Sequence, residues 1–396
     1  MVAVPRVLEA IYDGIINEIK SKSKLEQTIF NVTLNIAKYY IDLGIDGFRM
    51  DVISLIAKDE RFLDTGKEGY DMAPEYFAFQ PKLHEYLRQM REICFDGRNC
   101  MCVGETTFVN TNNANSVVGD GRELDLLFQF DLMDIDGKES KWDLKQFELK
   151  EFKNVIDKWQ KAIEWNTLFW SNHDQPRVVS RFGSTTDEYS WKTSSKMLAC
   201  AMYLLKGTPF IYQGEEIGMT NYPFTDENEL RDVESINLIK ETKKNGKDLG
   251  LIWEAILAKG RDNARTPIQW NDDINGGFTK GKPWIEVNPN YRVINVNKQI
   301  NEENSIVNFY KELIAFRNNN DIILKGEYKQ IMFDSNEIFA YERMLDDKKI
   351  VVYCNFTNKE IMLPVSINVE KLIDVEVSND GSNYVLNPYG ALVIKG

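Results

Sequence analysis

The sequence predicts an α/β barrel followed by a small antiparallel β-domain. Helical and strand patterns alternate along residues 25–213 and give five strands, as in folds built on a parallel sheet. Each of these strands ends in polar residues, and a (β/α) barrel carries its active site at these carboxyl ends. After Gly326 short alternating runs indicate a β-sandwich. An open doubly wound sheet is the alternative, but it usually gathers its ligands at one switch point.

The first predicted strand, at residues 45–53, carries an arginine and a carboxylate. It follows a helix whose apolar residues recur from Leu25 to Leu43 and which Gly44 is expected to end. Because successive side chains of a strand alternate faces, Arg49 and Asp51 are expected to point the same way. An arginine favours the ionised carboxylate, as a nucleophilic Asp requires. A buried ion pair that closes a strand fits the same pattern.

Four further strands follow, three of them after a predicted helix. The helices are expected near residues 82–92, 149–163 and 194–205, and the strands at 100–105, 124–131, 167–174 and 208–213. We therefore expect a catalytic barrel at residues 25–324, with a long polar insertion at about 217–303. A C-terminal β-sandwich domain is expected at residues 325–396, and residues 1–24 match neither domain.

Composition narrows the possible partners. The chain has 396 residues and a net charge of −13, which argues against nucleic acid or an anionic membrane as a partner. Its five cysteines are scattered and it has two histidines, so we predict neither a metal site nor a cofactor. The few, scattered cysteines also predict a location in the reducing cytoplasm. No apolar run approaches the roughly 20 residues that span a bilayer, and no signal peptide is recognisable.

Three carboxylates, Asp51, Glu105 and Asp174, lie where predicted strands end. A retaining glycosidase needs a nucleophile and an acid/base about 5–5.5 Å apart, and neighbouring strand ends can supply both. Taken singly, Glu105 fits a loop carboxylate and Asp174 a polar turn before Pro176. Their occurrence at several strand ends favours a glycosidase.

Five motifs carry a resemblance to a known family. They are GFRMDVI at residues 47–53, VGE at 103–105, NHDQPR at 172–177, GTPFIYQGEEIGM at 207–219 and GRDNARTPIQW at 260–270. Together they resemble the α-amylase superfamily (glycoside hydrolase family 13), and most closely its oligo-1,6-glucosidases. The resemblance implies the C-terminal part of a (β/α)8 TIM barrel, with about five of eight strands, before the β-sandwich.

The resemblance also implies a reaction and the residues that carry it. The substrate would be a small isomalto-oligosaccharide, cleaved at α-1,6 bonds from its non-reducing end by a retaining double displacement, and the enzyme a monomer. Asp51 would be the nucleophile, Glu105 the general acid/base, and Asp174 the residue that binds sugar hydroxyls and stabilises the transition state.

Five more residues acquire substrate-binding roles from the resemblance. Arg49 would orient Asp51, and His173 would donate to a glucose hydroxyl. Arg261, together with Arg265, would close the pocket around the non-reducing glucose. Val52 occupies the position that members cleaving α-1,6 bonds usually fill with Val, and trehalose-6-phosphate hydrolases often share it.

Three other functions stay open on the sequence. Trehalose-6-phosphate hydrolase and α-1,4-glucosidase belong to the same class of enzyme. A non-catalytic, amylase-like binding or transporter-associated protein belongs to another class, but such proteins typically lack the carboxylate set and carry a membrane anchor.

The beginning of the chain departs from the family pattern. Family members have three barrel strands ahead of the helix that here starts near Leu25, and these strands carry an Asp followed by Asn-His. No such run precedes Leu25, so we expect an N-terminally truncated glucosidase. A sheet of five strands leaves unpaired edges, which predicts poor folding and little turnover of isomaltose.

Overall fold

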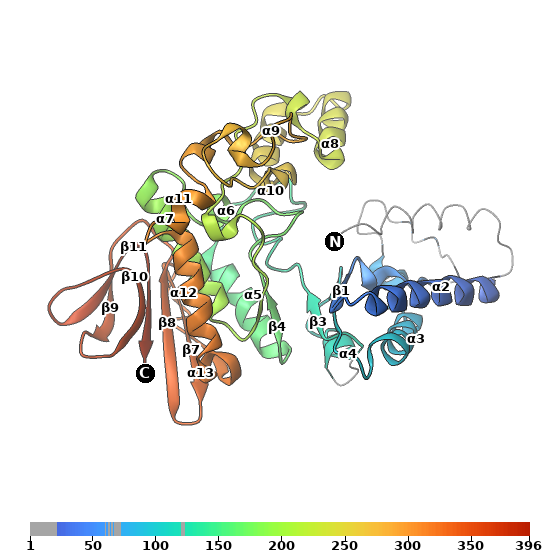
Figure 1. Ribbon diagram of the computed structural model, residues 1–396, viewed down its shortest axis with the longest axis horizontal. Coiled ribbons are helices and arrows are strands. Elements are labelled where there is room, and N and C mark those ends of the chain that lie inside the picture. Colours follow the sequence, from blue (N-terminus) through green and yellow to red (C-terminus); the bar gives the residue numbers. More distant parts are fainter. Residues whose placement is uncertain (1–21, 60, 62–63, 65, 67–72, 120–122) are drawn as a thin grey trace. The chain divides into compact units, whose positions relative to one another are not determined.

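The computed structural model describes residues 22–59, 61, 64, 66, 73–119 and 123–396. These residues form two compact units (Figure 1). Unit 1 runs as far as Phe130 and includes Ala162–Glu164, and unit 2 comprises Asp131–Lys161 and Trp165–Gly396. Most of the segment 1–24, predicted to match neither domain, lies outside the described residues, and the predicted domain boundaries stay predictions.

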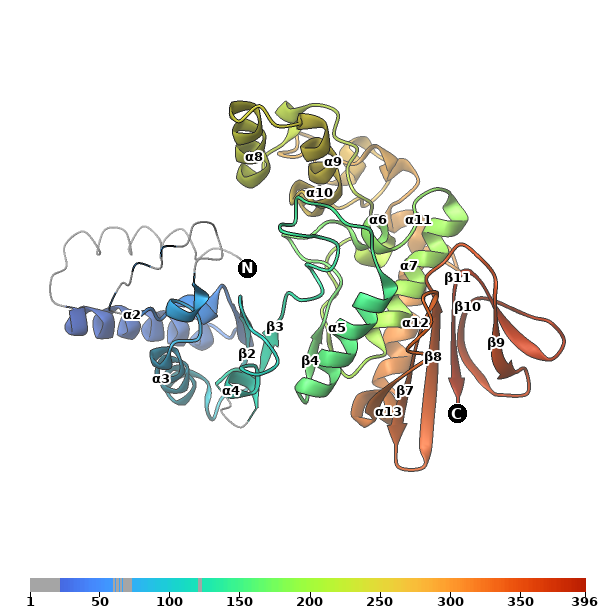
Figure 2. The same ribbon diagram turned by 180° about the vertical axis from the view of Figure 1, so that it is seen from behind.

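Unit 1 is built on a parallel sheet. Its strands are β1 (Gly47–Met50), β2 (Met101–Glu105) and β3 (Leu126–Phe128), in the order β1-β2-β3. The helical elements are α2 (Lys22–Asp42), η1 (Ile53–Leu55), η2 (Pro74–Tyr76), α3 (Pro81–Met90), η3 (Arg91–Phe95) and α4 (Asn115–Val118). Figure 2 shows α2 and α3 side by side, and the rings of Phe30 and Tyr86 lie 4.9 Å apart between them.

The predicted helix before β1 is confirmed as α2. Phe30, Leu34 and Ala37 recur at helical spacing and are buried, which anchors the helix through one apolar face. Gly44 follows with a φ of +92°, a left-handed conformation that lets the chain leave the helix and enter β1.

Gly47 sets the spacing between β1 and β2. It pairs with Met101 in the parallel register, and a Cβ atom added to Gly47 would lie 2.1 Å from the Met101 carbonyl oxygen. A side chain at this position would therefore force the two strands apart.

Gly47→Ala is expected to destabilise the fold by about 1–3 kcal/mol, the usual cost of overpacking. The urea midpoint of the variant should fall below that of the unmodified chain. Gly281→Ala is the control, because a Cβ there would meet only the Thr279 hydroxyl at 3.7 Å. Equal midpoints for the two variants would contradict the prediction.

Unit 2 contains a second parallel pair, β4 (Asn166–Leu168) with β5 (Gly207–Pro209). Around it lie α5 (Leu149–Ala162), α6 (Val178–Phe182) and α7 (Glu188–Tyr203). The segment after β5, predicted to be a long polar insertion, contains several short helices. They are η4 (Glu215–Ile217), η5 (Glu227–Glu229), α8 (Val233–Lys244), α9 (Leu249–Lys259), α10 (Asp262–Arg265), η6 (Ile274–Gly277), η7 (Pro289–Arg292) and α11 (Val296–Ile300).

Within the described residues, all five predicted barrel strands are present, but they are shorter than expected. β1 ends at Met50 instead of residue 53, because Val52 has a left-handed backbone with a φ of 46° that cannot continue a strand. Asp51 therefore lies just beyond β1 and not inside it.

The predicted C-terminal antiparallel domain is confirmed. After α12 (Ile306–Asn318) and α13 (Asp321–Lys325) come β6 (Glu327–Ile331), β7 (Ile338–Leu345), β8 (Lys348–Asn355), β9 (Ile361–Ser366), β10 (Lys371–Asn379) and β11 (Asn383–Lys395). The sheet order is β10-β11-β8-β7-β6, and β9 also pairs with β11. Leu363 of β9 shares a core with Val351 of β8 and Leu392 of β11, so the strands enclose apolar side chains.

Two buried arginines, Arg317 of α12 and Arg343 of β7, contact the carboxyl end of α7. Arg317 Nη1 donates to the carbonyls of Tyr203, at 2.9 Å, and Leu205, at 3.0 Å. Arg343 donates to the Leu204 carbonyl at 2.8 Å and the Gly326 carbonyl at 2.6 Å. Cations are favoured where helix carbonyls lack intrahelical partners, so these arginines complete the end of α7.

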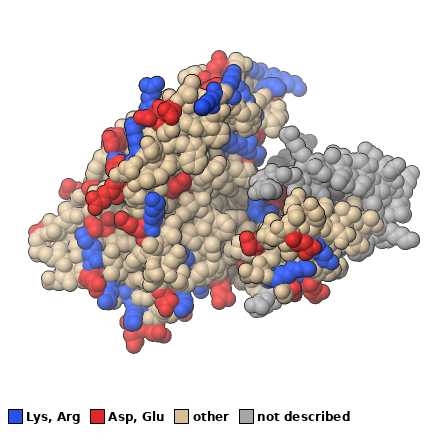
Figure 3. Space-filling view, in the orientation of Figure 1, with Lys and Arg blue, Asp and Glu red and all other residues tan. Residues whose placement is uncertain are grey.

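The surface carries charges of both signs. In Figure 3 acidic and basic side chains are interspersed over the face in view, a pattern that suits a neutral ligand better than a polyanion. Among the helices that the structure describes, none is long and apolar enough to cross a membrane.

Candidate active site

The ends of β1 and β2 bring three predicted site residues of unit 1 together. Arg49 pairs with Val103 in the sheet register, so Glu105, at the end of β2, lies close to it. Arg49 Nη1 donates to Asp51 Oδ1, and Arg49 Nη2 donates to Glu105 Oε2 at 2.5 Å. One guanidinium therefore holds both carboxylates.

Two backbone features fix this arrangement. The left-handed turn at Val52 directs its N–H toward Glu105, to whose Oε2 it donates at 3.4 Å. At Gly104 an added Cβ would lie 2.5 Å from Leu124 Cδ1 and 2.9 Å from Ile53 Cγ2. Glycine before Glu105 thus allows apolar side chains to pack closely beneath the carboxylate.

The two carboxylates have different surroundings. The side chain of Glu105 is 12% exposed and that of Asp51 is 50% exposed. Burial, together with a hydrogen bond to Asp51, raises the pKa of Glu105 to about 7, although the charge of Arg49 opposes this shift. A carboxyl group with such a pKa can donate a proton near neutral pH, which is the property that a general acid needs.

A second group of predicted site residues gathers in unit 2 around Asp174. Arg265 Nη2 donates to Asp174 Oδ1 at 2.8 Å, and Arg265 Nε donates to the His173 carbonyl at 3.1 Å. Arg261 Nε lies 3.5 Å from the same Asp174 oxygen, and His173 Nε2 lies 3.5 Å from Asp174 Oδ2. The loop after β4 and the helix α10 therefore meet at one carboxylate.

Further acidic residues balance the two arginines, and sequence reasoning missed them. Asp232 Oδ1 lies 3.5 Å from Arg265 Nη1, and Glu234 Oε2 lies 3.1 Å from Arg261 Nε. Glu234 also accepts from Lys141 at 2.5 Å. The available signal was the pattern of Asp232 before an amphipathic segment, which predicts a helix cap and not a partner for an arginine.

Beneath this group, Glu215 joins the chain after β5 to the chain after β4. It is 3% exposed and accepts from Ser171 Oγ at 3.2 Å, from Tyr310 OH at 3.0 Å and from Tyr203 OH. Burial raises the pKa of Glu215 to about 7 even though these hydroxyls oppose the shift. Three donors to one buried carboxyl satisfy its acceptors, which indicates a rigid support.

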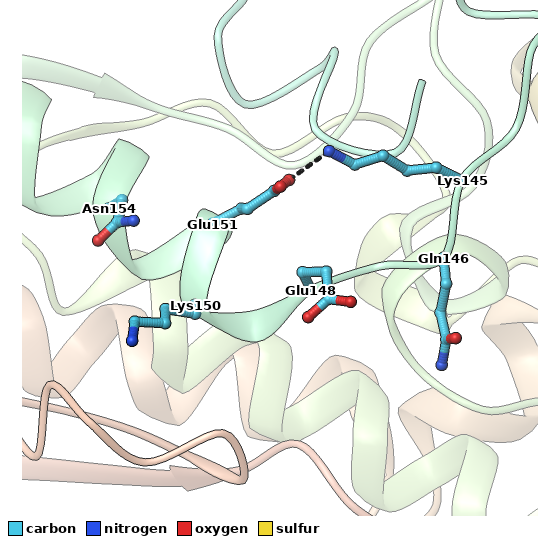
Figure 4. A pocket seen from close by; sticks show the side chains of 6 residues that line it. All are labelled: Lys145, Gln146, Glu148, Lys150, Glu151 and Asn154. Atoms are coloured by element: carbon cyan, nitrogen blue, oxygen red, sulfur yellow. Dashed lines mark ion pairs between the residues drawn. The ribbon is translucent and has the colours of Figure 1, made fainter. Parts of the chain in front are cut away.

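A surface pocket of about 410 Å³ lies elsewhere, at the start of α5. Figure 4 shows its lining of long polar side chains, among which Lys145 and Glu151 form an ion pair of 2.6 Å. The lining consists of Lys145, Gln146, Glu148, Lys150, Glu151 and Asn154. None of the predicted site residues lines this pocket, so it is not the candidate active site.

No group of three or more His, Cys, Asp or Glu within the described ranges could hold a metal ion.

Comparison with known proteins defines the class of this protein. Residues 20–326 match the family described as alpha amylase, catalytic domain. This match agrees with carboxylates that lie at or after the carboxyl ends of parallel strands and with the antiparallel domain that follows. The chain belongs to the alpha-amylase family.

Individual relatives narrow the comparison. The chain is 45% identical to an oligo-1,6-glucosidase of Bacillus cereus over 387 residues, which cover 94% of this chain and 68% of that protein. It is 40% identical to a trehalose-6-phosphate hydrolase of Bacillus subtilis, with 90% of this chain and 65% of the relative covered. Among solved structures, trehalose-6-phosphate hydrolase of Bacillus licheniformis superimposes with a TM-score of 0.85 at 37% identity, covering 93% of this chain and 68% of that one.

Proposed function

We propose that this enzyme is an α-glucosidase that hydrolyses α-1,6-glucosidic bonds of isomalto-oligosaccharides from the non-reducing end, with retention. The observation that carries the proposal is the contact of Arg49 with two carboxylates of different exposure, one of which has a pKa near neutrality. Oligo-1,6-glucosidases are among the relatives with 40–45% identity to this chain, which supports the linkage.

In the proposed reaction, Asp51 attacks the anomeric carbon while the bond from that carbon to the leaving oxygen breaks. Glu105 gives its proton to the leaving oxygen, so the aglycone departs as an alcohol. In the second step the Glu105 carboxylate takes a proton from water, which displaces Asp51 from the glucosyl group. Two inversions restore the original configuration at the anomeric carbon.

The remaining predicted residues would bind the sugar. Asp174 would accept from glucose hydroxyls and stabilise positive charge in the transition state, and His173 would donate to a hydroxyl. Arg261 and Arg265 would close the pocket, a role supported by their contacts with Asp174. The side chain of Val52 would favour the α-1,6 linkage, while its backbone N–H steadies Glu105.

Trehalose 6-phosphate is the second candidate substrate, because hydrolases of this compound are also close relatives. A phosphate would need a cation that is not already neutralised. Arg261 and Arg265 each contact carboxylates, namely Asp174, Glu234 and Asp232. This charge balance favours a neutral sugar.

The test compares kcat/KM of the 396-residue chain for isomaltose, maltose and trehalose 6-phosphate. Isomaltose should have the highest kcat/KM of the three substrates, with the small kcat expected of a sheet with unpaired edges. NMR should show that the glucose from the non-reducing end is released as the α anomer. Asp51→Asn is the control for contaminating activity. A preference for trehalose 6-phosphate would contradict the proposed specificity for α-1,6 bonds. Binding of a glucose-like iminosugar without any turnover would favour a non-catalytic, sugar-binding function.

We propose the cytoplasm as the site of action and a monomer as the working form. All five cysteines are free thiols, which supports a reducing compartment. Light scattering coupled to size-exclusion chromatography gives the oligomeric state, and a mass of twice 45.9 kDa would contradict the monomer.

The pH dependence of isomaltose hydrolysis should have its alkaline limb near pH 7. Glu105 must be protonated to act as the acid, and its pKa is raised to about 7. The rate kcat/KM should therefore fall about tenfold per pH unit above this value. Glu105→Gln should remove the limb together with most activity, and an unmodified chain whose rate stays constant up to pH 9 would contradict the assignment.

A further inference from the structure

Arg177 is a fully buried arginine that donates mainly to backbone carbonyls. It is 2% exposed, and its Nη1 donates to the Gln213 carbonyl at 2.6 Å. Its other donors go to the end of α10, where Nε contacts the Asn263 carbonyl at 3.0 Å and Nη2 the Ala264 carbonyl at 3.1 Å. Burial lowers the pKa of Arg177 to about 10. Because this value is still well above 7, the guanidinium is protonated at neutral pH.

The surroundings of Arg177 hold it in a single orientation. Nη2 also contacts Thr266, through its carbonyl at 3.4 Å and its hydroxyl at 3.2 Å. The guanidinium carbon lies 5.6 Å from the centre of the Tyr212 ring, and the Tyr212 hydroxyl donates to the same Ala264 carbonyl at 3.0 Å. A planar fork with several donors can reach all of these acceptors at once, whereas a lysine ammonium is a single point.

The loop after β4 and the helix α10 are thus joined by two arginines, one from each segment. From the loop, Arg177 reaches the carbonyls of α10. In return, Arg265 reaches the Asp174 carboxylate and the His173 carbonyl on the loop. Arg177 lies three residues after Asp174, so both arginines act on the same short stretch. Rotation of α10 away from this loop would break both sets of contacts together.

We propose that Arg177 is a positioning residue that holds Arg261 and Arg265 at their working distance from Asp174. The inference rests on the proposed function for its catalytic consequence. Its structural part, the restraint of Arg265, does not depend on which sugar the enzyme cleaves.

The test replaces Arg177 with Lys and uses Arg317→Lys as a matched control. Arg317 is also buried and also donates to backbone carbonyls, but these belong to the end of α7. Phenylglyoxal modifies arginine side chains, and peptide mass spectrometry gives the rate at each position. Arg177→Lys should raise the modification rate of Arg265 at least tenfold, whereas Arg317→Lys should leave it within twofold while lowering Tm.

Kinetics supply the second measurement. Arg177→Lys should raise KM for isomaltose about tenfold with a smaller change in kcat, because the pocket arginines bind the glucose before reaction. Arg317→Lys should leave KM unchanged. If Arg177→Lys does not fold, Thr266→Val removes one acceptor of Arg177 and should give a two- to threefold change in both measurements.

Equal modification rates and equal KM values for the Arg177 and Arg317 variants would overturn the positioning role. Absence of turnover by the unmodified chain would instead count against the proposed function. In that case the modification rate of Arg265 alone decides whether Arg177 restrains it.

Discussion

Replacement of Arg49 by Met is expected to lower kcat/KM for isomaltose about 10³-fold or more, equivalent to about 4 kcal/mol of transition-state stabilisation. Arg49 contacts both Asp51 and Glu105, and its charge opposes the rise in the pKa of Glu105. Without it the carboxylate of Asp51 loses the neighbouring positive charge that favours its ionised form. Asp51 would then be a poorer nucleophile.

The matched variant is Arg49→Lys, which keeps the positive charge but cannot bridge two carboxylates with separate donors. Its kcat/KM should lie between those of the unmodified chain and Arg49→Met. The alkaline limb of the pH profile should move upward in Arg49→Met, because the charge that lowers the pKa of Glu105 is gone. A loss below tenfold would show that the contact is structural.

Replacement of Arg343 by Met is expected to lower the free energy of unfolding by about 3 kcal/mol. The carbonyls of Leu204 and Gly326 would lose their donor, and each buried acceptor left unpaired costs about 1–3 kcal/mol. Relief from burying the cation offsets part of this loss, since burial already lowers the pKa of Arg343 to about 10. Urea denaturation followed by circular dichroism measures the change.

Lys329→Met is the control for this prediction, because Lys329 is 64% exposed and lies 4.0 Å from its partner Glu342. Exposed ion pairs of this kind contribute about 0–1 kcal/mol. The two variants should therefore differ by about 2 kcal/mol or more. Similar urea midpoints would mean that other groups or water satisfy the end of α7 when Arg343 is absent.

Much of the fold was predictable because it rests on local patterns. The five barrel strands and the C-terminal antiparallel domain follow from apolar periodicity and turn residues. The proximity of Arg49 and Asp51 followed from alternation along a strand, although Asp51 lies beyond the strand end. The left-handed backbone of Val52 was not predictable, because β-branched residues rarely adopt it.

Partners that are distant in the sequence were beyond prediction. Asp232 and Glu234 lie about 60 residues from Asp174 in a segment without a recognisable motif. Arg177, Arg317 and Arg343 would be assigned to the surface by their polarity. Their partners are backbone carbonyls, which every residue has, so no side chain in the sequence marks where a buried arginine will bind. Glu215 was placed in a motif, but its three hydroxyl partners come from separate elements.

The cap on α7 also bears on how the protein is made. The Leu204 carbonyl accepts a hydrogen bond from Arg343, which is synthesised 139 residues later. At ribosomal rates of about 5–20 residues per second, this interval lasts on the order of ten seconds. During this time the end of α7 exists without one of its final partners. The Leu204 carbonyl can therefore gain this donor only after β7 has been synthesised.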